Sequence, residues 1–489
     1  MSGLQLDSKI KYSALLVFLL TAWFSIGHHH SDEYFQILEF AQYKLGHINA
    51  SDLPWEFHEQ MRPSLQPWIA FVSIKLLSNL GVLNPFAIAT IFRLISALLL
   101  WFVIFKLNRL ITTKYFPDKM WSSLFYFAAY LLWFVPYMSV RFSSENFAQL
   151  FLLLGLFFFL NESRSYGKLF AIGALFGLSV LFRYQMGIVV LGIFIWMLFK
   201  ANYGFYRLAF VYCSFLMVIF FGIYLDFLFY NEFVFTAFNY LKLNLIEGKA
   251  SDFGTSPWWY YLVTFLGAAA PPISIVLLAS FIGGSLKLKN TVFVWSIIPF
   301  ILIHFLIAHK ELRFLFPVSY LFIYISIYGL MEYFKNRKIK QWHRRLFRTS
   351  IGINILLLFF MMFRPAHEMV ANYKYLYDHI DLGNRTILTI QKDNYKLLAG
   401  LKSTFYTPDS YFSDHVESEE NLSQYLMENK IDTCFFVYGK FDFNGSLKGY
   451  ESSKVYSVYP EWLKSIKWID WQKTLKTHSI YLLTRKEGK

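Results

Sequence analysis

The chain has 489 residues, of which 56% are hydrophobic and 21% aromatic, and its formal net charge at pH 7 is +14. A mean hydropathy of +0.40 is too high for a soluble globular protein of this charge content and indicates a polytopic membrane protein. The bases stand in short clusters between apolar runs, where lipid headgroups and membrane insertion explain them, so we expect no nucleic acid partner.

The apolar runs predict about eleven transmembrane helices, because a perpendicular span needs ~20 apolar residues. The first run, 9–27, lacks an obvious small-residue cleavage site and predicts an uncleaved anchor. Further spans are expected at 85–105, 120–138, 147–160, 169–182, 186–199, 207–225, 261–281, 291–308, 314–334 and 349–363. The run 65–83 is interrupted by Lys75, Ser78 and Asn79, and fits an amphipathic interfacial helix as well as a span.

The distribution of charge predicts the side of the membrane on which each loop lies. If 65–83 lies flat in the interface, most basic clusters collect on one side, which the positive-inside rule makes cytoplasmic. The densest of these clusters is 335–348. The opposite, outer side then receives the first outer loop, 28–84, the short polar clusters between later spans, and everything after Arg364.

The last part of the chain, 364–489, differs in sequence pattern from the rest, because its apolar runs are short and separated by polar residues. Strand-like runs at 386–390, 434–438 and 480–484 surround a helical stretch near 417–429. We therefore predict two domains, a transmembrane domain over 1–363 and a small extracytoplasmic α/β domain over 364–489.

An acidic pair, Asp32 and Glu33, follows the first span within HHHSDEYFQILE at 28–39. In an α-helix, Asp32, Gln36 and Glu39 would share a polar face opposite an apolar one. That face would look into a water-filled cavity, where a carboxylate can act as a general base.

A second interpretation of the acidic pair is structural. Ser31 would then be an N-cap, and the acids would merely complement the helix dipole. The three histidines at 28–30 suggest a metal, but three consecutive imidazoles cannot all face one ion, so we expect no metal site.

Four further polar residues of the outer loops, and one tryptophan, are candidates for substrate contacts. Trp55 is either an interfacial anchor or part of a site together with Glu56. Arg62 suggests a structural ion pair or a phosphate contact. Arg141 and Glu145 stand four residues apart, which is the spacing of a structural salt bridge at a helix start and also places both in an outer loop.

The loop 226–260 adds Lys242 and the aromatic run Trp258, Trp259 and Tyr260. Aromatic platforms stack on sugar faces, but such a run after a proline is also typical of an interfacial belt.

His309, Lys310 and Arg313 interrupt two strongly apolar runs. Ionisable residues at such a place are costly and usually functional. If this segment is helical, Lys310 and Arg313 share a face with His309 and can bind one phosphate. Snorkelling cations at a helix end are the alternative.

These segments together resemble the signatures of glycosyltransferase family 22, the lipid-phosphate-mannose-dependent mannosyltransferases of glycosylphosphatidylinositol and asparagine-linked glycan assembly. The resemblance runs in order over about 28–320: HHHSDEYFQILEFA to HPDExxQxxExA, PWEF…MRPSLQP to TWEW…RSxxxP, RLISA to RLxSA, RFSSENFAQ to RTxSNxxE, FNYLKLN…PWWYY to NFLKxN…PWHWY, and HKELRFLFP to HKExRFxxP. Ser31 replaces the family's proline, and Trp259 replaces its central histidine.

The resemblance implies a GT-C membrane fold and an inverting transfer of mannose, or a similar hexose, from a polyprenyl- or dolichyl-phosphate donor to a glycan or glycolipid acceptor. It makes Asp32 the general base and implies no required metal or other cofactor. Such a reaction needs one carboxylate for the acceptor's proton and cations for the departing phosphate, which His309, Lys310 and Arg313 can supply.

A transporter or flippase of lipid-linked solutes is the competing class. Transporters place polar residues near mid-membrane and often carry internal repeats, whereas these residues crowd one face and no repeat is evident. Membrane lipids are expected partners. The pattern favours a bacterial inner membrane with an outward-facing site over an endoplasmic reticulum membrane with a lumenal one.

Overall fold

A computed structural model describes residues 3–486 except 162–164, 202, 380–385, 390–396, 399–400, 408–412, 441, 444, 446 and 467–477. The chain divides into two compact units, each discontinuous in sequence. Unit 1 consists of Met1–Ser25, Glu59–Trp68 and Ile91–Arg364, and unit 2 of Ile26–His58, Ile69–Thr90 and Pro365–Lys489. The acidic segment 28–39 and the expected outer domain therefore both belong to unit 2.

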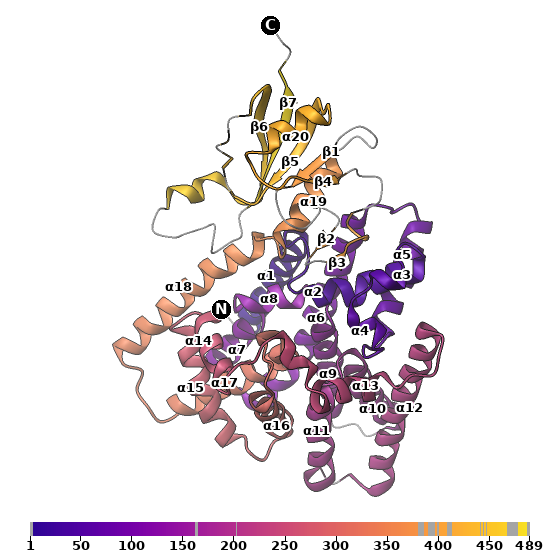
Figure 1. Ribbon diagram of the computed structural model, residues 1–489. Helices are drawn as coiled ribbons and strands as arrows, with labels where there is room; N and C mark the ends of the chain where they lie inside the picture. The colour runs from indigo at the N-terminus through magenta and orange to yellow at the C-terminus, as the bar shows by residue number, and fades with distance from the viewer. Residues whose placement is uncertain are drawn as a thin grey trace. The chain divides into compact units, whose positions relative to one another are not determined.

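Unit 1 is built from helices (Figure 1). Its longer helices are α1 (Gly3–Phe24), α7 (Lys119–Leu131), α9 (Ser144–Leu160), α10 (Tyr166–Phe182), α11 (Met186–Lys200), α12 (Phe205–Tyr230), α15 (Ile273–Lys287), α16 (Val292–Leu306), α17 (Ser319–Phe334) and α18 (Gln341–Phe363). Its shorter ones are α8 (Phe134–Ser139), α13 (Thr236–Leu241), η3 (Lys242–Ile246), η4 (Lys249–Phe253), α14 (Tyr260–Ala268) and η5 (Leu312–Val318). Two helices, α5 (Leu65–Asn79) and α6 (Pro85–Tyr115), contain residues of both units.

Within the described residues, four helices are long and apolar enough to cross a membrane, namely Pro85–Tyr115, Phe205–Tyr230, Leu312–Phe334 and Gln341–Phe363. Shorter apolar helices accompany them at Ser144–Leu160, Tyr166–Phe182, Met186–Lys200, Ile273–Lys287 and Val292–Leu306. These helices coincide with the expected apolar runs, so the prediction of a helical, multi-pass membrane protein is confirmed. The total of about eleven spans stays a prediction.

The run 120–138, expected as one span, is broken between α7 and α8. Asn354 of α18 satisfies the backbone at the break, because its amide donates to the Leu131 carbonyl at 2.7 Å and its side-chain oxygen accepts from Trp133 N at 2.9 Å. A break at membrane depth needs such partners, since lipid offers none.

The run 261–281 is also divided, into α14 and α15. Pro271 and Pro272 stand between the two helices and have no backbone N–H to continue the hydrogen-bond ladder. The ambiguous run 65–83 contains α5, whose 15 residues are fewer than a perpendicular span needs, which favours the interfacial interpretation.

Small residues allow close helix packing in unit 1. A Cβ on Gly329 of α17 would lie 2.0 Å from the carbonyl oxygen of Ser280, and one on Gly284 of α15 would lie 2.1 Å from that of Ile325. Because each glycine faces the other helix's backbone, any side chain here would push α15 and α17 apart.

Unit 2 combines short helices with a sheet. Its helices are α2 (Ser31–Glu33), η1 (Tyr34–Glu39), α3 (Phe40–Leu45), η2 (Ala50–Asp52), α4 (Trp55–His58), α19 (Glu368–His379), α20 (Leu422–Glu428) and η6 (Glu461–Ser465). Its strands are β1 (Thr386–Thr389), β2 (Leu397–Leu398), β3 (Leu401–Lys402), β4 (Ser413–His415), β5 (Thr433–Tyr438), β6 (Tyr450–Ser457) and β7 (Ser479–Arg485).

The main sheet has the strand order β4-β1-β5-β7-β6. Strand β1 runs parallel to β4 and β5, and β7 runs antiparallel to β5 and β6. Leu422 and Leu426 of α20 pack with Leu388 and Phe436 of the sheet, and Figure 1 shows α20 beside these strands. The predicted small α/β domain is thus confirmed, with β1, β5, β7 and α20 at the expected places; residue 390 lies outside the described residues.

Candidate functional site

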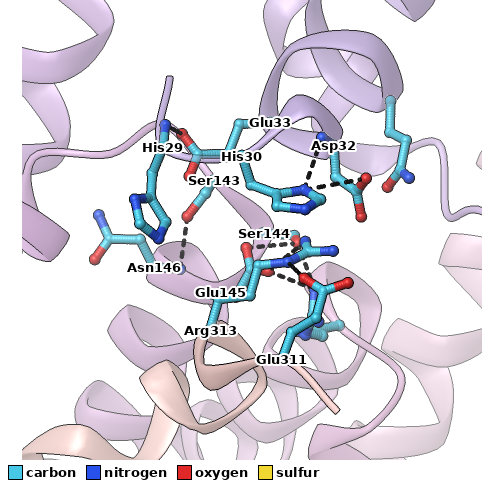
Figure 2. A network of polar contacts seen from close by, with 12 residues as sticks. His29, His30, Asp32, Glu33, Ser143, Ser144, Glu145, Asn146, Glu311 and Arg313 are labelled. Carbon is cyan, nitrogen blue, oxygen red and sulfur yellow. Dashed lines mark hydrogen bonds and ion pairs between the residues drawn. The ribbon is translucent and has the colours of Figure 1, made fainter. Parts of the chain in front are cut away.

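The acidic pair lies in α2, a helix of three residues in unit 2 (Figure 2). His30 precedes this helix in extended backbone, and its Nδ1 accepts a hydrogen bond from Asp32 N at 3.2 Å. The same nitrogen lies 3.3 Å from Asp32 Oδ1. Glu33 Oε2 accepts from His29 N at 3.1 Å. The expectation that Ser31 caps the helix is therefore wrong, because the imidazole of His30 takes that position.

The two carboxylates consequently differ in what they do locally. Glu33 bonds the backbone in front of the helix, whereas Asp32 contacts a titratable ring. The side chain of Asp32 is 20% exposed and that of His30 is 33% exposed. A half-buried carboxylate that keeps some exposure can take up a proton from a bound hydroxyl group.

The segment after α2 is a π-helix, η1, and this changes which residues share a face. Its i→i+5 turns are wider than α-helical turns, so the α-helical spacing does not apply. Gln36 Nε2 donates to Glu56 Oε1 at 3.1 Å, which brings two expected site residues together. Glu39 is fully buried and accepts from Thr404 N at 2.7 Å. The expectation that Glu39 faces a water-filled cavity with Asp32 is wrong.

The three consecutive histidines have separate environments. The ring of His28 is buried and stacks on His367 at 4.5 Å and on Tyr34 at 5.2 Å between centroids. His29 bonds Glu33 through its backbone, and His30 caps α2. Among the described residues no group of three or more histidine, cysteine, aspartate or glutamate side chains could hold a metal ion.

Unit 1 contains a buried ionic cluster, which we call the arginine cluster: Glu145, Arg183, Glu311 and Arg313 (Figure 2 labels all but Arg183). Glu145 Oε1 lies 2.8 Å from an Arg183 nitrogen and 3.1 Å from an Arg313 nitrogen. Arg313 also donates through Nε to Glu311. The exposed fractions are 3% for Glu145, 8% for Arg183 and 6% for Arg313, so these charges are buried together.

Local structure places each member of the arginine cluster. Ser143 caps α9, and its hydroxyl accepts from Asn146 N at 3.3 Å, so Glu145 stands in the first helical turn. Arg183 directly follows the end of α10, and Arg313 lies in η5.

Arg141, predicted as a salt-bridge partner of Glu145, donates to the Tyr137 carbonyl at 3.1 Å and to Ser25.

The cations at 309–313 do not lie on one helix face, so that expectation is wrong. Glu311 has extended backbone, and η5 begins only at Leu312. Lys310 Nζ donates to the Ser256 carbonyl at 3.0 Å, and His309 contacts the Gly254 carbonyl at 2.8 Å and Glu311 Oε1 at 3.0 Å. His309 and Arg313 are nevertheless joined, because both bind Glu311.

A second buried carboxylate of unit 1, Asp226, was not a sequence candidate. Asp226 Oδ1 accepts from Ser64 N at 2.8 Å and Ser64 Oγ at 2.6 Å, and Oδ2 accepts from Thr236 Oγ1 at 2.5 Å. It thereby fixes the loop that carries Arg62, whose guanidinium lies 5.8 Å from the ring centre of Tyr240. The sequence did contain a signal for Asp226, because a single acidic residue within the apolar run of α12 is costly unless it has partners.

Of the remaining candidates, Lys242, Trp258 and Trp259 are exposed, whereas Tyr260 and Trp55 are half-buried. Lys242 pairs with Glu247 at 3.2 Å, and its side chain is 52% exposed. Trp258 and Trp259 are 63% and 46% exposed, so their faces are accessible. Tyr260 begins α14, and Trp55 begins α4.

Residues 10–412 match the Alg9-like mannosyltransferase family. GPI mannosyltransferase 3 of Candida albicans is 26% identical over 368 residues, which cover 74% of this chain and 70% of that protein. GPI alpha-1,2-mannosyltransferase 3 of Bos taurus is 24% identical, with 73% of this chain and 65% of that protein covered. The chain thus spans about two thirds of the length of these relatives. A crystal structure of ArnT from Cupriavidus metallidurans bound to undecaprenyl phosphate is 11% identical over 88% of this chain and 92% of that one, with a TM-score of 0.49.

Proposed function

Because the chain belongs to the Alg9-like mannosyltransferase family, we propose that it transfers mannose, or a similar hexose, from a polyprenyl- or dolichyl-phosphate donor to a glycan or glycolipid acceptor. The family match over 10–412 is the observation that carries this proposal. Membership confirms the expected family and the class of enzyme, a membrane glycosyltransferase. The two relatives described above are GPI mannosyltransferases by name, which supports a lipid-linked glycan as acceptor.

Asp32 is the proposed general base. The acceptor oxygen attacks the anomeric carbon, the bond from that carbon to the phosphate oxygen breaks with inversion, and the acceptor's proton moves to Asp32. His30 Nδ1 accepts from Asp32 N and lies 3.3 Å from Asp32 Oδ1, so the imidazole helps to hold Asp32 in place. Glu33 orients the helix start through its bond to His29 N.

The arginine cluster, together with Lys310 and His309, is the proposed site for the phosphate. Within the arginine cluster the two arginines balance Glu145 and Glu311. Lys310 adds one positive charge, so the proposed phosphate site has a net charge of +1. The side chain of Glu311 is 25% exposed and that of Glu145 is 4% exposed. Glu311 is therefore the partner that a phosphate displaces, while Glu145 keeps the two guanidinium groups in place.

Two pairs of candidate residues are proposed sugar contacts. Gln36 and Glu56 form a hydrogen-bonded pair that can bind sugar hydroxyls, and the exposed faces of Trp258 and Trp259 can stack on a sugar ring. We place Asp32 and residues 364–489 on the outer side and 335–348 in the cytoplasm, in a bacterial inner membrane. Labelling of Asp32→Cys and Arg345→Cys with an impermeant reagent tests this orientation, and labelling from the same side would refute it.

The decisive experiment assays purified protein with a panel of polyprenyl- and dolichyl-phosphate hexoses and glycolipid acceptors. Asp32→Asn keeps the size of the side chain but cannot take a proton, so turnover should fall by ~10²–10⁴-fold while the protein stays folded. Glu33→Gln is the matched control and should cost less. Near-normal turnover of Asp32→Asn with an inactive Glu33→Gln would reverse the two roles, and activity in both variants would refute the proposed mechanism.

A further inference from the structure

The carboxylate of Glu39 accepts hydrogen bonds from four donors, and three of these belong to Thr404 and Phe405 and not to its own helix. Its Oε1 accepts from Thr404 N at 2.7 Å and from Phe405 N at 3.0 Å, and its Oε2 accepts from Thr404 Oγ1 at 2.5 Å. The hydroxyl of Tyr34 also donates to Oε1. All of these groups belong to unit 2.

The environment of this carboxylate is fully enclosed. Glu39 and Tyr34 are both 0% exposed, and Tyr34 OH also contacts Ser403 Oγ at 2.6 Å. Burial raises the pKa of Glu39, while the hydrogen bonds from Thr404 and Tyr34 act in the opposite direction. A buried carboxylate is tolerated only where such donors replace the hydrogen bonds of water. The position of residues 403–405 therefore depends on Glu39, and the position of Glu39 depends on them.

The π-helix explains how Glu39 and Tyr34 meet. In η1 the residues five apart face each other across one wide turn, so Tyr34 at its first position reaches Glu39 at its last. The ring of Tyr34 also stacks on Tyr406 at 5.4 Å. Since η1 directly follows α2, the contacts that fix the position of η1 also fix the orientation of the Asp32 side chain on α2.

The beginning of the acidic segment is held by the same part of the chain. The carbonyl of Ile26 accepts from Ala366 N at 2.7 Å and from His367 N at 3.2 Å. Gly27 has φ +91°, and a Cβ there would lie 2.8 Å from the Cβ of His367. Residues 26–39 are therefore bound at both ends to the part of unit 2 that follows Pro365, with Asp32 between the two attachments.

We propose that Glu39 is a positioning residue, which anchors the acidic segment to residues 403–405 and thereby fixes the orientation of Asp32. This inference rests on the proposed function only where it names Asp32 as the base. It assigns a role in the reaction to the small α/β domain, which holds the acidic segment in its active geometry.

Amide hydrogen exchange on the full-length protein in detergent tests the anchor without relying on activity. Glu39→Met keeps the approximate length of the side chain but removes both acceptor oxygens, so the backbone N–H groups of Thr404 and Phe405 lose their acceptor. We expect exchange of these two amides to become at least ~10-fold faster and the amides at 30–33 to follow. In transfer assays kcat should fall while KM for the donor changes little.

Three variants accompany this test. Tyr34→Phe removes a single donor and keeps the carboxylate, so it should give a smaller effect in the same direction even where Glu39→Met does not fold. Thr404→Val removes the hydroxyl donor and leaves both backbone bonds. Lys402→Gln is the matched control in the same segment, because Lys402 makes only a long contact of 3.6 Å to Asp52 among the described residues and should change neither exchange nor kcat.

The outcomes separate the anchor from the proposed function. Unchanged exchange at Thr404 and Phe405 in Glu39→Met overturns the anchor. Faster exchange there with unchanged exchange at 30–33 and unchanged kcat overturns the coupling to Asp32. Faster exchange at both places supports the anchor even if Asp32→Asn is fully active, in which case the assignment of the base fails alone.

Discussion

The buried carboxylate of Glu145 gives the sharpest prediction about the arginine cluster. Glu145→Gln preserves its shape and removes its charge. Within the described residues, the other polar partners of Arg183 are Ser144 Oγ at 3.2 Å and Gln185 Oε1 at 2.8 Å, which are neutral. Removing one partner of a buried ion pair costs about 3–5 kcal/mol, and we expect about 3 kcal/mol because Arg313 keeps Glu311.

A bound phosphate should offset this loss. If the cluster binds the donor's phosphate, an added polyprenyl phosphate supplies the missing negative charge and stabilises Glu145→Gln more than it stabilises the wild type. Ligand at about 100 times its dissociation constant adds about 2.7 kcal/mol to the free energy of unfolding. Denaturant titration in detergent micelles, with and without the lipid phosphate, measures both values.

Asp226→Asn is the matched control for this experiment. Asp226 is as buried as Glu145, at 3% exposed, but Ser64 and Thr236 donate to it without charge. Its removal therefore leaves no unpaired cation, and lipid phosphate should stabilise this variant no more than the wild type. An equal gain in both variants, or no gain in Glu145→Gln, would refute the assignment of the phosphate to the arginine cluster.

Three smaller predictions follow from single contacts. Arg313→Lys should weaken donor binding and only partly preserve activity, because an ammonium cannot bond two carboxylates as the guanidinium does; unchanged donor affinity would remove Arg313 from the site. Lys242→Gln should leave turnover within twofold in the same assay, because its pair with Glu247 is half exposed. Hydrogen bonds from Lys464 hold the pKa of Asp442 below its ordinary value of 3.8, so its stabilising contribution is complete above pH 3.8 and lost as the pH falls through the lowered value. Acid unfolding followed by circular dichroism should begin at a higher pH in Asp442→Asn, and an unchanged midpoint would contradict this.

The helices were predictable from sequence because burial in lipid or protein demands long apolar runs. Such runs can be recognised without knowing which other segments pack against them. Their breaks were not predictable to the same degree. Pro271 and Pro272 are a visible signal for the division of 261–281. The division of 120–138 depends on Asn354, which lies more than two hundred positions away and supplies the bonds that make the break tolerable.

Candidate site residues could be identified from sequence where they lie close together in one segment. Asp32 and Glu33 were identified as candidates from the acidic segment alone, and the cations at 309–313 from their cost beside apolar runs; their roles stay predictions. The partners were not, because they are distant in sequence. Arg183 meets Glu145 across 38 positions, and the π-helix at 34–39 replaced the expected α-helical face by one that no periodicity rule describes.

Three buried carboxylates show why an acid's role follows from its partners. Glu39 and Asp226 both accept from hydroxyl groups and from backbone N–H groups of another segment, so each stabilises one backbone arrangement whether substrate is bound or not. Glu145 lies between two arginines, and its charge keeps them close together before an anion arrives. Removing the oxygens of Glu39 or Asp226 should therefore loosen the backbone that bonds them. Removing only the charge of Glu145 should leave Arg183 and Arg313 to repel each other until a phosphate binds between them.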